Sequence, residues 1–105
     1  MELKLSPNAD DDEFFLFERV IGHLQHSYSH GHEHATMLVN QYYSKFTDAA
    51  YCHKYQIPVQ TVDFFCHIEA RGMADRVQYY EVLDHLPDEA AFIVWQRKQF
   101  QSSGS

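Results

Sequence analysis

Histidine supplies the first candidates for chemistry in this chain. The sequence contains eight histidines, and intervals of three or four residues separate His23, His26, His30 and His34. At about 100° per residue, side chains at this spacing share one face of an unbroken helix. Two histidines four residues apart on a helix can hold one metal ion, so His26, His30 and His34 are candidate ligands for zinc, copper or nickel.

The same histidines could instead form a solvated face that responds to pH. The formal net charge is −7 with histidine counted neutral, and the eight imidazoles would more than offset it if all were protonated. Histidine titrates near about pH 6.5, so mild acid would remove most of the negative charge. Gly31 lies inside the run and favours a helix end there, which places the histidines at a junction between two helices.

Two Cys-His dipeptides, Cys52-His53 and Cys66-His67, form a second candidate set. Adjacent residues on a helix point about 100° apart, so neither dipeptide is a good chelate. Free cysteines usually lie in the core, and we expect both to be buried there. Glycine-rich phosphate loops and nucleophile motifs are missing from the sequence, and the partial H-E-x-x-H match at His32 has Thr36 in the second histidine position. We expect a non-catalytic protein without a cofactor, with zinc as the alternative.

Acidic residues gather in two short stretches. Asp10–Glu13 and Asp84–Glu89 together contain seven of the 15 acidic residues. The eight Lys and Arg residues are scattered, apart from Arg97-Lys98. Binding of nucleic acid or of an anionic membrane needs clustered basic residues, so the charge pattern argues against both. It favours a basic protein partner, whose association would depend on ionic strength.

Adjacent aromatic residues add candidate contact surface. They are Tyr42-Tyr43, Phe64-Phe65 and Tyr79-Tyr80. Neighbours on a helix cannot both face one narrow core stripe, so we expect some of these rings at the surface, although a small core that uses both rings is the alternative. Tyrosine beside carboxylates is typical of protein-binding surfaces. We therefore expect the partner-binding residues to be Asp10, Asp11, Asp12, Glu13, Tyr42, Tyr79, Asp84, Asp88 and Glu89.

Helices must position these groups. Acidic residues in a first turn complement the helix dipole, and residues such as Asp, Ser and Thr cap helix starts. Apolar residues at helical spacing then predict helices over about 10–28, from Ala35 to Phe46, from a cap at Asp48 to before Pro58, from a cap at Thr61 to a stop at Arg71-Gly72, and over Met73–Leu83.

The segment 90–97 is ambiguous. Pro87-Asp88-Glu89 before it and Arg97-Lys98 after it suit a helix, whereas Phe92–Trp95 has the composition of a strand. We favour the helix, which makes residues 1–100 one all-α domain of about five short helices, followed by a flexible tail over 101–105. The alternative is an α+β domain with a short two- or three-stranded sheet from residues 1–5, 76–82 and 91–97.

Length and composition indicate the general class of protein. A chain of 105 residues suits one domain, its apolar runs are too short to span a bilayer, and its two cysteines do not make a disulfide scaffold. We expect a cytoplasmic, acidic protein-binding module, similar in size, acidity and lack of catalytic motif to immunity or antitoxin-like inhibitors that neutralise a basic toxin such as a nuclease. The alternative is a histidine-rich protein that binds divalent metal or senses pH.

Overall fold

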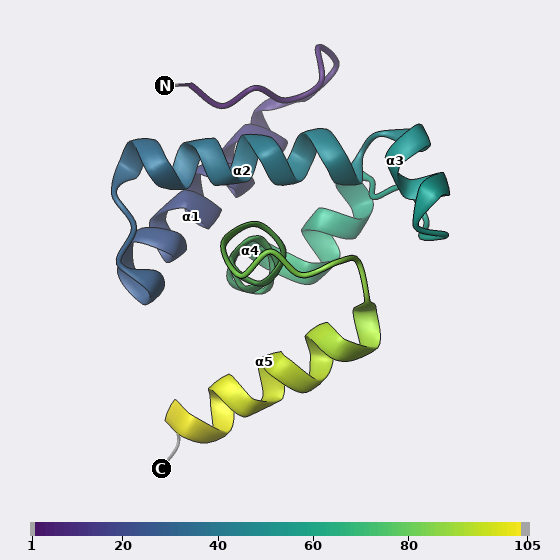
Figure 1. Cartoon of the computed structure of the whole chain (residues 1–105). Coiled ribbons are helices and arrows are strands. Elements are labelled where there is room, and N and C mark those ends of the chain that lie inside the picture. The colour runs from purple at the N-terminus through teal and green to yellow at the C-terminus, as the bar shows by residue number, and fades with distance from the viewer. Residues whose placement is uncertain (1, 104–105) are drawn as a thin grey trace.

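Residues 2–103, the part of the chain that the computed structural model describes, contain five α-helices and one π-helical turn, together with non-helical segments (Figure 1). The elements are α1 (Asp11–Tyr28), α2 (His32–Phe46), α3 (Ala49–Lys54), α4 (Val62–Val77), the π-helical turn η1 (Gln78–Val82) and α5 (Glu89–Ser103). Residues 2–103 contain no strand. The all-α prediction is thus confirmed, and the alternative sheet from residues 1–5, 76–82 and 91–97 is wrong.

The side chains of Asp10, Asp48 and Thr61 cap the starts of α1, α3 and α4. The carboxylate of Asp10 accepts a hydrogen bond from the amide of Glu13 at 2.9 Å, and Asp48 caps α3 in the same way. The hydroxyl of Thr61 accepts from the amide of Phe64 at 3.3 Å and caps α4. Each cap satisfies an amide that has no partner inside its own helix, so the predicted starts of these helices are confirmed.

The junction between α1 and α2 interrupts the histidine run. Ser29 adopts the left-handed conformation with φ 61°, and its amide donates to the carbonyl of Leu24, which ends α1. Gly31 is the extended residue before α2. The predicted interruption at Ser29–Gly31 is confirmed, and it leaves His26 in α1 and His30 in the connection between α1 and α2.

The predicted stop at Arg71-Gly72 is wrong. The break in α4 comes earlier, at Glu69, whose φ of 70° and ψ of 166° are not helical. The helix then continues through Gly72, where an added Cβ would lie 2.7 Å from the Cγ2 of Ile68. Glycine is needed at this position for close packing against Ile68, and not as a helix terminator.

The core lies between α1, α2 and α4, and α5 lies below them in the view of Figure 1. Phe17, Tyr42, Phe65 and Met73 are among the side chains that are fully buried there. The helix predicted over 90–97 is confirmed as part of α5, which joins the core through buried Phe92. Its helix runs on to Ser103, through the first three residues of the expected flexible tail, and residues 104–105 lie outside the described part. No helix among the described residues is both long and apolar enough to cross a lipid bilayer.

Candidate partner-binding site

The predicted three-histidine site is not formed. Because the chain turns at Ser29, His26 and His30 do not share a helix face. The rings of His30 and His34 lie 5.1 Å apart, and Nε2 of His30 is 2.8 Å from the side-chain oxygen of Gln78. Among the described residues, no group of three or more His, Cys, Asp or Glu side chains is arranged to hold a metal ion.

The two cysteines differ in environment. Cys52 is buried, as expected, and its Sγ lies 3.5 Å from the carbonyl oxygen of Phe46. Burial raises the pKa of this thiol, which makes it a poor nucleophile at neutral pH. Cys66 is exposed on α4, so the expectation that both thiols are core residues is wrong for Cys66.

Tyr42 and Tyr79 are buried, and the expectation that they form a partner surface is wrong. The Tyr42 side chain is 0% exposed, its ring stacks on Phe46 at 4.3 Å, and its hydroxyl donates to Gln60 at 2.6 Å. Tyr79 is 4% exposed, with its ring 4.1 Å from that of His85.

The physical reason is that η1 has a neighbour on each of two sides. Tyr79 contacts Phe92 and Trp95 of α5, whereas Tyr80 contacts Phe92 of α5 and also Phe46 of α2. The two adjacent rings therefore share a neighbour on α5, Tyr80 reaches α2 in addition, and both become core residues. The argument from one narrow apolar stripe fails because this segment packs on more than one element.

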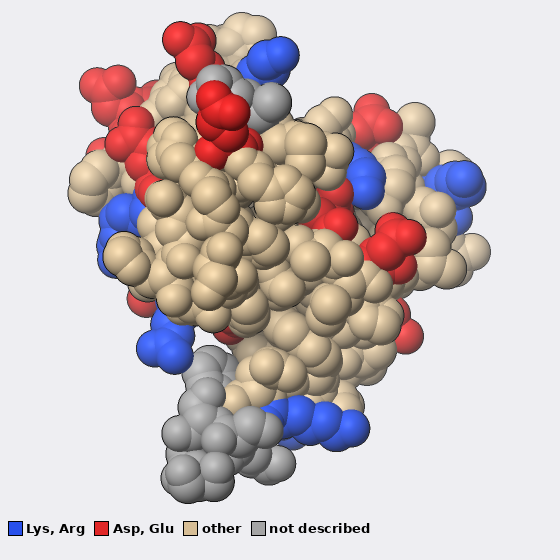
Figure 2. Space-filling model, turned by 60° about the vertical axis from the view of Figure 1, so that its left-hand side comes forward, with Lys and Arg blue, Asp and Glu red and all other residues tan. Residues whose placement is uncertain are grey.

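The predicted acidic residues also divide into two groups. Four of them serve the fold: Asp10 caps α1, Glu13 is 6% exposed, Asp88 accepts from the amide of Ala91, and Glu89 pairs with Arg76. Asp11, Asp12 and Asp84 are exposed. Figure 2 shows carboxylates along the margins of one face and a broad middle region without Lys, Arg, Asp or Glu.

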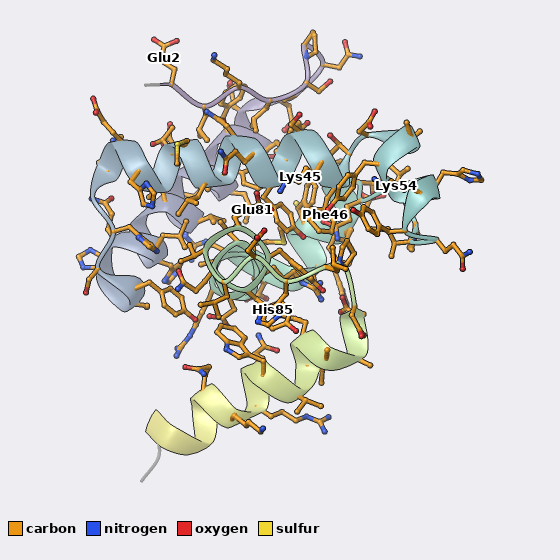
Figure 3. All side chains as sticks on the ribbon, in the orientation of Figure 1. Glu2, Lys45, Phe46, Lys54, Glu81 and His85 are labelled. Carbon is orange, nitrogen blue, oxygen red and sulfur yellow. The ribbon has the colours of Figure 1, made fainter. Side chains whose placement is uncertain are left out.

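A buried carboxylate that the sequence analysis missed lies between α2 and η1. Glu81 and Lys45 point toward one another (Figure 3), and Lys45 Nζ donates to Glu81 Oε1 at 2.9 Å. The side chain of Glu81 is 2% exposed and that of Lys45 is 41% exposed. The second carboxylate oxygen of Glu81, Oε2, is buried and accepts no hydrogen bond from the described part of the chain. A buried oxygen without a partner is unusual, because the large majority of buried polar atoms in native proteins are hydrogen-bonded.

The surroundings of Glu81 form a hollow of about 570 Å³. Its walls include Lys4, Asn40, Ser44, Lys45, Glu81 and Asp84. Burial raises the pKa of Glu81, the bond from Lys45 opposes that rise, and the charge of Asp84 adds to it. The hollow thus combines a costly buried charge with a π-helical turn, a conformation that is frequent at functional sites.

Exposed apolar side chains lie in the segment 83–88, which follows η1 and which we call the 83–88 loop. Leu83 is 43% exposed and Leu86 is 70% exposed. Between them, Asp84 has a left-handed backbone with φ 55° and also lines the hollow beside Glu81. The loop and the hollow are therefore parts of one surface.

Sequence reasoning found Asp84 but not Glu81 or the leucines. The residues that form the hollow are far apart in the chain, and Lys45 and Glu81 are separated by 36 positions. A signal was present in Tyr79–Leu83, where Glu81 is the one charged residue among side chains that suit burial. Comparisons with protein-family models, with curated proteins and with solved structures find no match for this chain, so its own residues carry what is proposed for its function.

Proposed function

We propose that this chain is a non-catalytic protein-binding module whose partner is a basic protein. The observation that carries the proposal is the 83–88 loop, where two exposed leucines alternate with carboxylates. Leu83 and Leu86 supply apolar surface that is stabilised by being covered. Asp84 and Asp88 supply charges that select a positively charged partner.

The overall charge supports the same partner class. The chain carries a formal charge of −7, and Asp11 and Asp12 on α1 are exposed in addition to Asp84. Such a charge attracts a cationic protein over distance and speeds association at low ionic strength. In its most concrete form, the module is an immunity or antitoxin-like inhibitor that covers the cationic site of a toxin such as a nuclease.

Capture from cells of the native source tests this function. The wild-type chain is compared with a double variant, Leu83→Ser with Leu86→Ser, and with Phe15→Ser as a control. Phe15 is 62% exposed on α1, so its substitution removes similar apolar surface at another place. We expect one basic protein to be retained by the wild type and by the control, to be lost from the double variant, and to be released by salt.

Two results would contradict the proposal. One is the same set of captured proteins for all three chains when circular dichroism shows each to be helical. The other is a captured partner that is acidic or that salt does not release. Either result would remove the 83–88 loop as the binding surface for a basic protein.

A further inference from the structure

We propose that the hollow beside Glu81 binds one positively charged hydrogen-bond donor, the guanidinium of an arginine or the ammonium of a lysine. This inference rests on the proposed function, because the group would belong to a side chain of the basic partner. It assigns a specific place on the surface to a specific chemical class, whereas the 83–88 loop alone indicates only apolar contact beside negative charge.

The first step is the state of the Glu81 carboxylate. Lys45 satisfies Oε1 at 2.9 Å, while Oε2 is buried without a donor from the described residues. Burial without a hydrogen bond destabilises a polar atom, and the effect is largest when the atom carries charge. A donor that enters the hollow would remove this cost, and a cationic donor would form the stronger, charge-assisted bond.

The second step is the charge of the walls. Asp84 lies close enough for its carboxylate to disfavour ionisation of Glu81, so two negative groups face the same space. Two cationic residues, Lys45 and Lys4, also line the hollow. The ammonium of Lys45 is already bonded to Glu81, and Lys4 is an exposed residue of the N-terminal segment. A cation placed between Glu81 and Asp84 would relieve their mutual repulsion.

The third step is the way the backbone holds the site. Glu81 belongs to η1, and the wider π-helical turn changes the direction of side chains relative to a continued α4. On the opposite wall, Asn40 ties the N-terminal segment to α2, since its Oδ1 accepts from the Lys4 amide at 2.8 Å and its Nδ2 donates to the Glu2 carbonyl. The site is therefore built from segments that the fold fixes before any ligand arrives.

The fourth step is size and position. The hollow of about 570 Å³ can take the end of one long side chain, since sites of about 300–1,000 Å³ hold small molecules. Asp84 belongs both to its wall and to the 83–88 loop. A partner that covers Leu83 and Leu86 would thus have its neighbouring cationic side chain within reach of Glu81.

Small probes test the inference without a partner. The intact chain, labelled with ¹⁵N, is titrated with Nα-acetyl-argininamide, with Nα-acetyl-lysinamide, and with Nα-acetyl-citrullinamide. Citrulline keeps the shape and donors of arginine but is neutral. We expect saturable shifts of backbone amides in 40–45 and 81–84 with arginine, and at least about fivefold weaker binding of citrulline because only the charged donor gains charge-assisted bonds.

Variants locate the effect. Glu81→Gln removes the negative charge with little change in shape, and it should abolish the shifts, whereas Asp12→Asn removes an exposed charge on α1 and should preserve them. If Glu81→Gln does not fold, Asp84→Asn at an exposed position takes its place and should weaken arginine binding. Equal binding of arginine and citrulline, shifts confined to other residues, or full binding by Glu81→Gln would overturn the inference.

The two proposals fail in different ways. A titration without the expected shifts overturns the cation site and leaves capture through Leu83 and Leu86 as a separate result. A positive titration combined with capture that does not depend on these leucines overturns the proposed function and leaves the site standing as a cation-binding hollow.

Discussion

Two ion pairs in this protein are built in opposite ways. In the pair of Lys45 with Glu81, the carboxylate is 2% exposed and the ammonium is 41% exposed. In the pair of Arg76 with Glu89, the guanidinium is 5% exposed and the carboxylate is 55% exposed. One pair therefore buries a negative charge and the other buries a positive charge.

Arg76 makes two hydrogen bonds and Glu81 accepts one, and each keeps one buried atom, Nε of Arg76 and Oε2 of Glu81, without a partner in the described chain. Both terminal nitrogens of Arg76 donate to the two oxygens of Glu89, and the guanidinium lies 5.1 Å from the ring centre of Phe64 and 4.6 Å from that of Phe92. Burial opposes the charge of Arg76, but the hydrogen bonds and charge of Glu89, together with Tyr42 and Tyr80, outweigh it and raise the pKa of the guanidinium. Aromatic faces and a bidentate partner suit arginine because its guanidinium group is planar and weakly hydrated.

The buried glutamate lacks such support. Glu81 accepts one hydrogen bond, from Lys45, and keeps a buried oxygen without a partner in the described chain. The comparison teaches that the Arg76 pair ties α4 to α5 through two hydrogen bonds and two aromatic faces, whereas Glu81 is held by one hydrogen bond from a lysine that is 41% exposed. It also predicts different responses to substitution, because a carboxylate can take up a proton and an arginine stays charged.

The largest effect is expected from Glu89→Ala. This change leaves the buried, permanently charged Arg76 without its carboxylate, and breaking a buried pair in this way costs about 3–5 kcal/mol in the free energy of unfolding. The exposure of Glu89 favours the lower end of that range. Urea unfolding followed by circular dichroism measures the loss, with Glu18→Ala on the exposed face of α1 as the control. A loss no larger than that of the control would show that the aromatic faces alone hold Arg76.

A smaller loss is expected from Lys45→Met, about 1–2 kcal/mol at neutral pH, because Glu81 then loses its only hydrogen-bond donor among the described residues. Without Lys45, the pKa of Glu81 in the folded chain should rise further. The folded chain then holds this proton more tightly than the unfolded chain, so the loss is present at neutral pH and shrinks in acid. Urea unfolding near pH 5 and near pH 7 checks the sign. A loss that grows in acid would contradict the burial of Glu81.

The smallest effect on stability is expected from Glu81→Gln, within about 1 kcal/mol of the wild type at neutral pH, since the costly charge disappears together with its bond to Lys45. The pKa of Glu81 is raised on folding. Its contribution to stability is therefore greatest below its unfolded pKa of about 4.3 and declines as the pH rises through the folded value. The free energy of unfolding of the variant, measured from about pH 4 to about pH 7, should lack this decline. An unchanged pH profile would mean that Glu81 is solvated in solution.

Local patterns account for much of the fold. Asp10, Asp48 and Thr61 cap helices as expected because each bonds an amide only three residues ahead. The break at Glu69 escaped the sequence analysis, since a positive φ at a residue other than glycine has no local sequence signal. In the candidate site, Asp84 and Asp88 were predicted as surface acids, but the roles of Glu89 and Glu13 depend on partners from other elements.

By itself, the sequence determined the negative charge, the helical segments and the interruption of the histidine run at Ser29–Gly31, because these depend on composition and on neighbours within one or two turns. Only the tertiary structure decided that Tyr42 and Tyr79 are core residues, that Cys66 is exposed, and that Glu81 is buried beside Lys45. Each of these outcomes depends on which distant element covers a side chain. A helical period shows the direction of a side chain around its own axis, but it cannot show how many neighbours surround that axis.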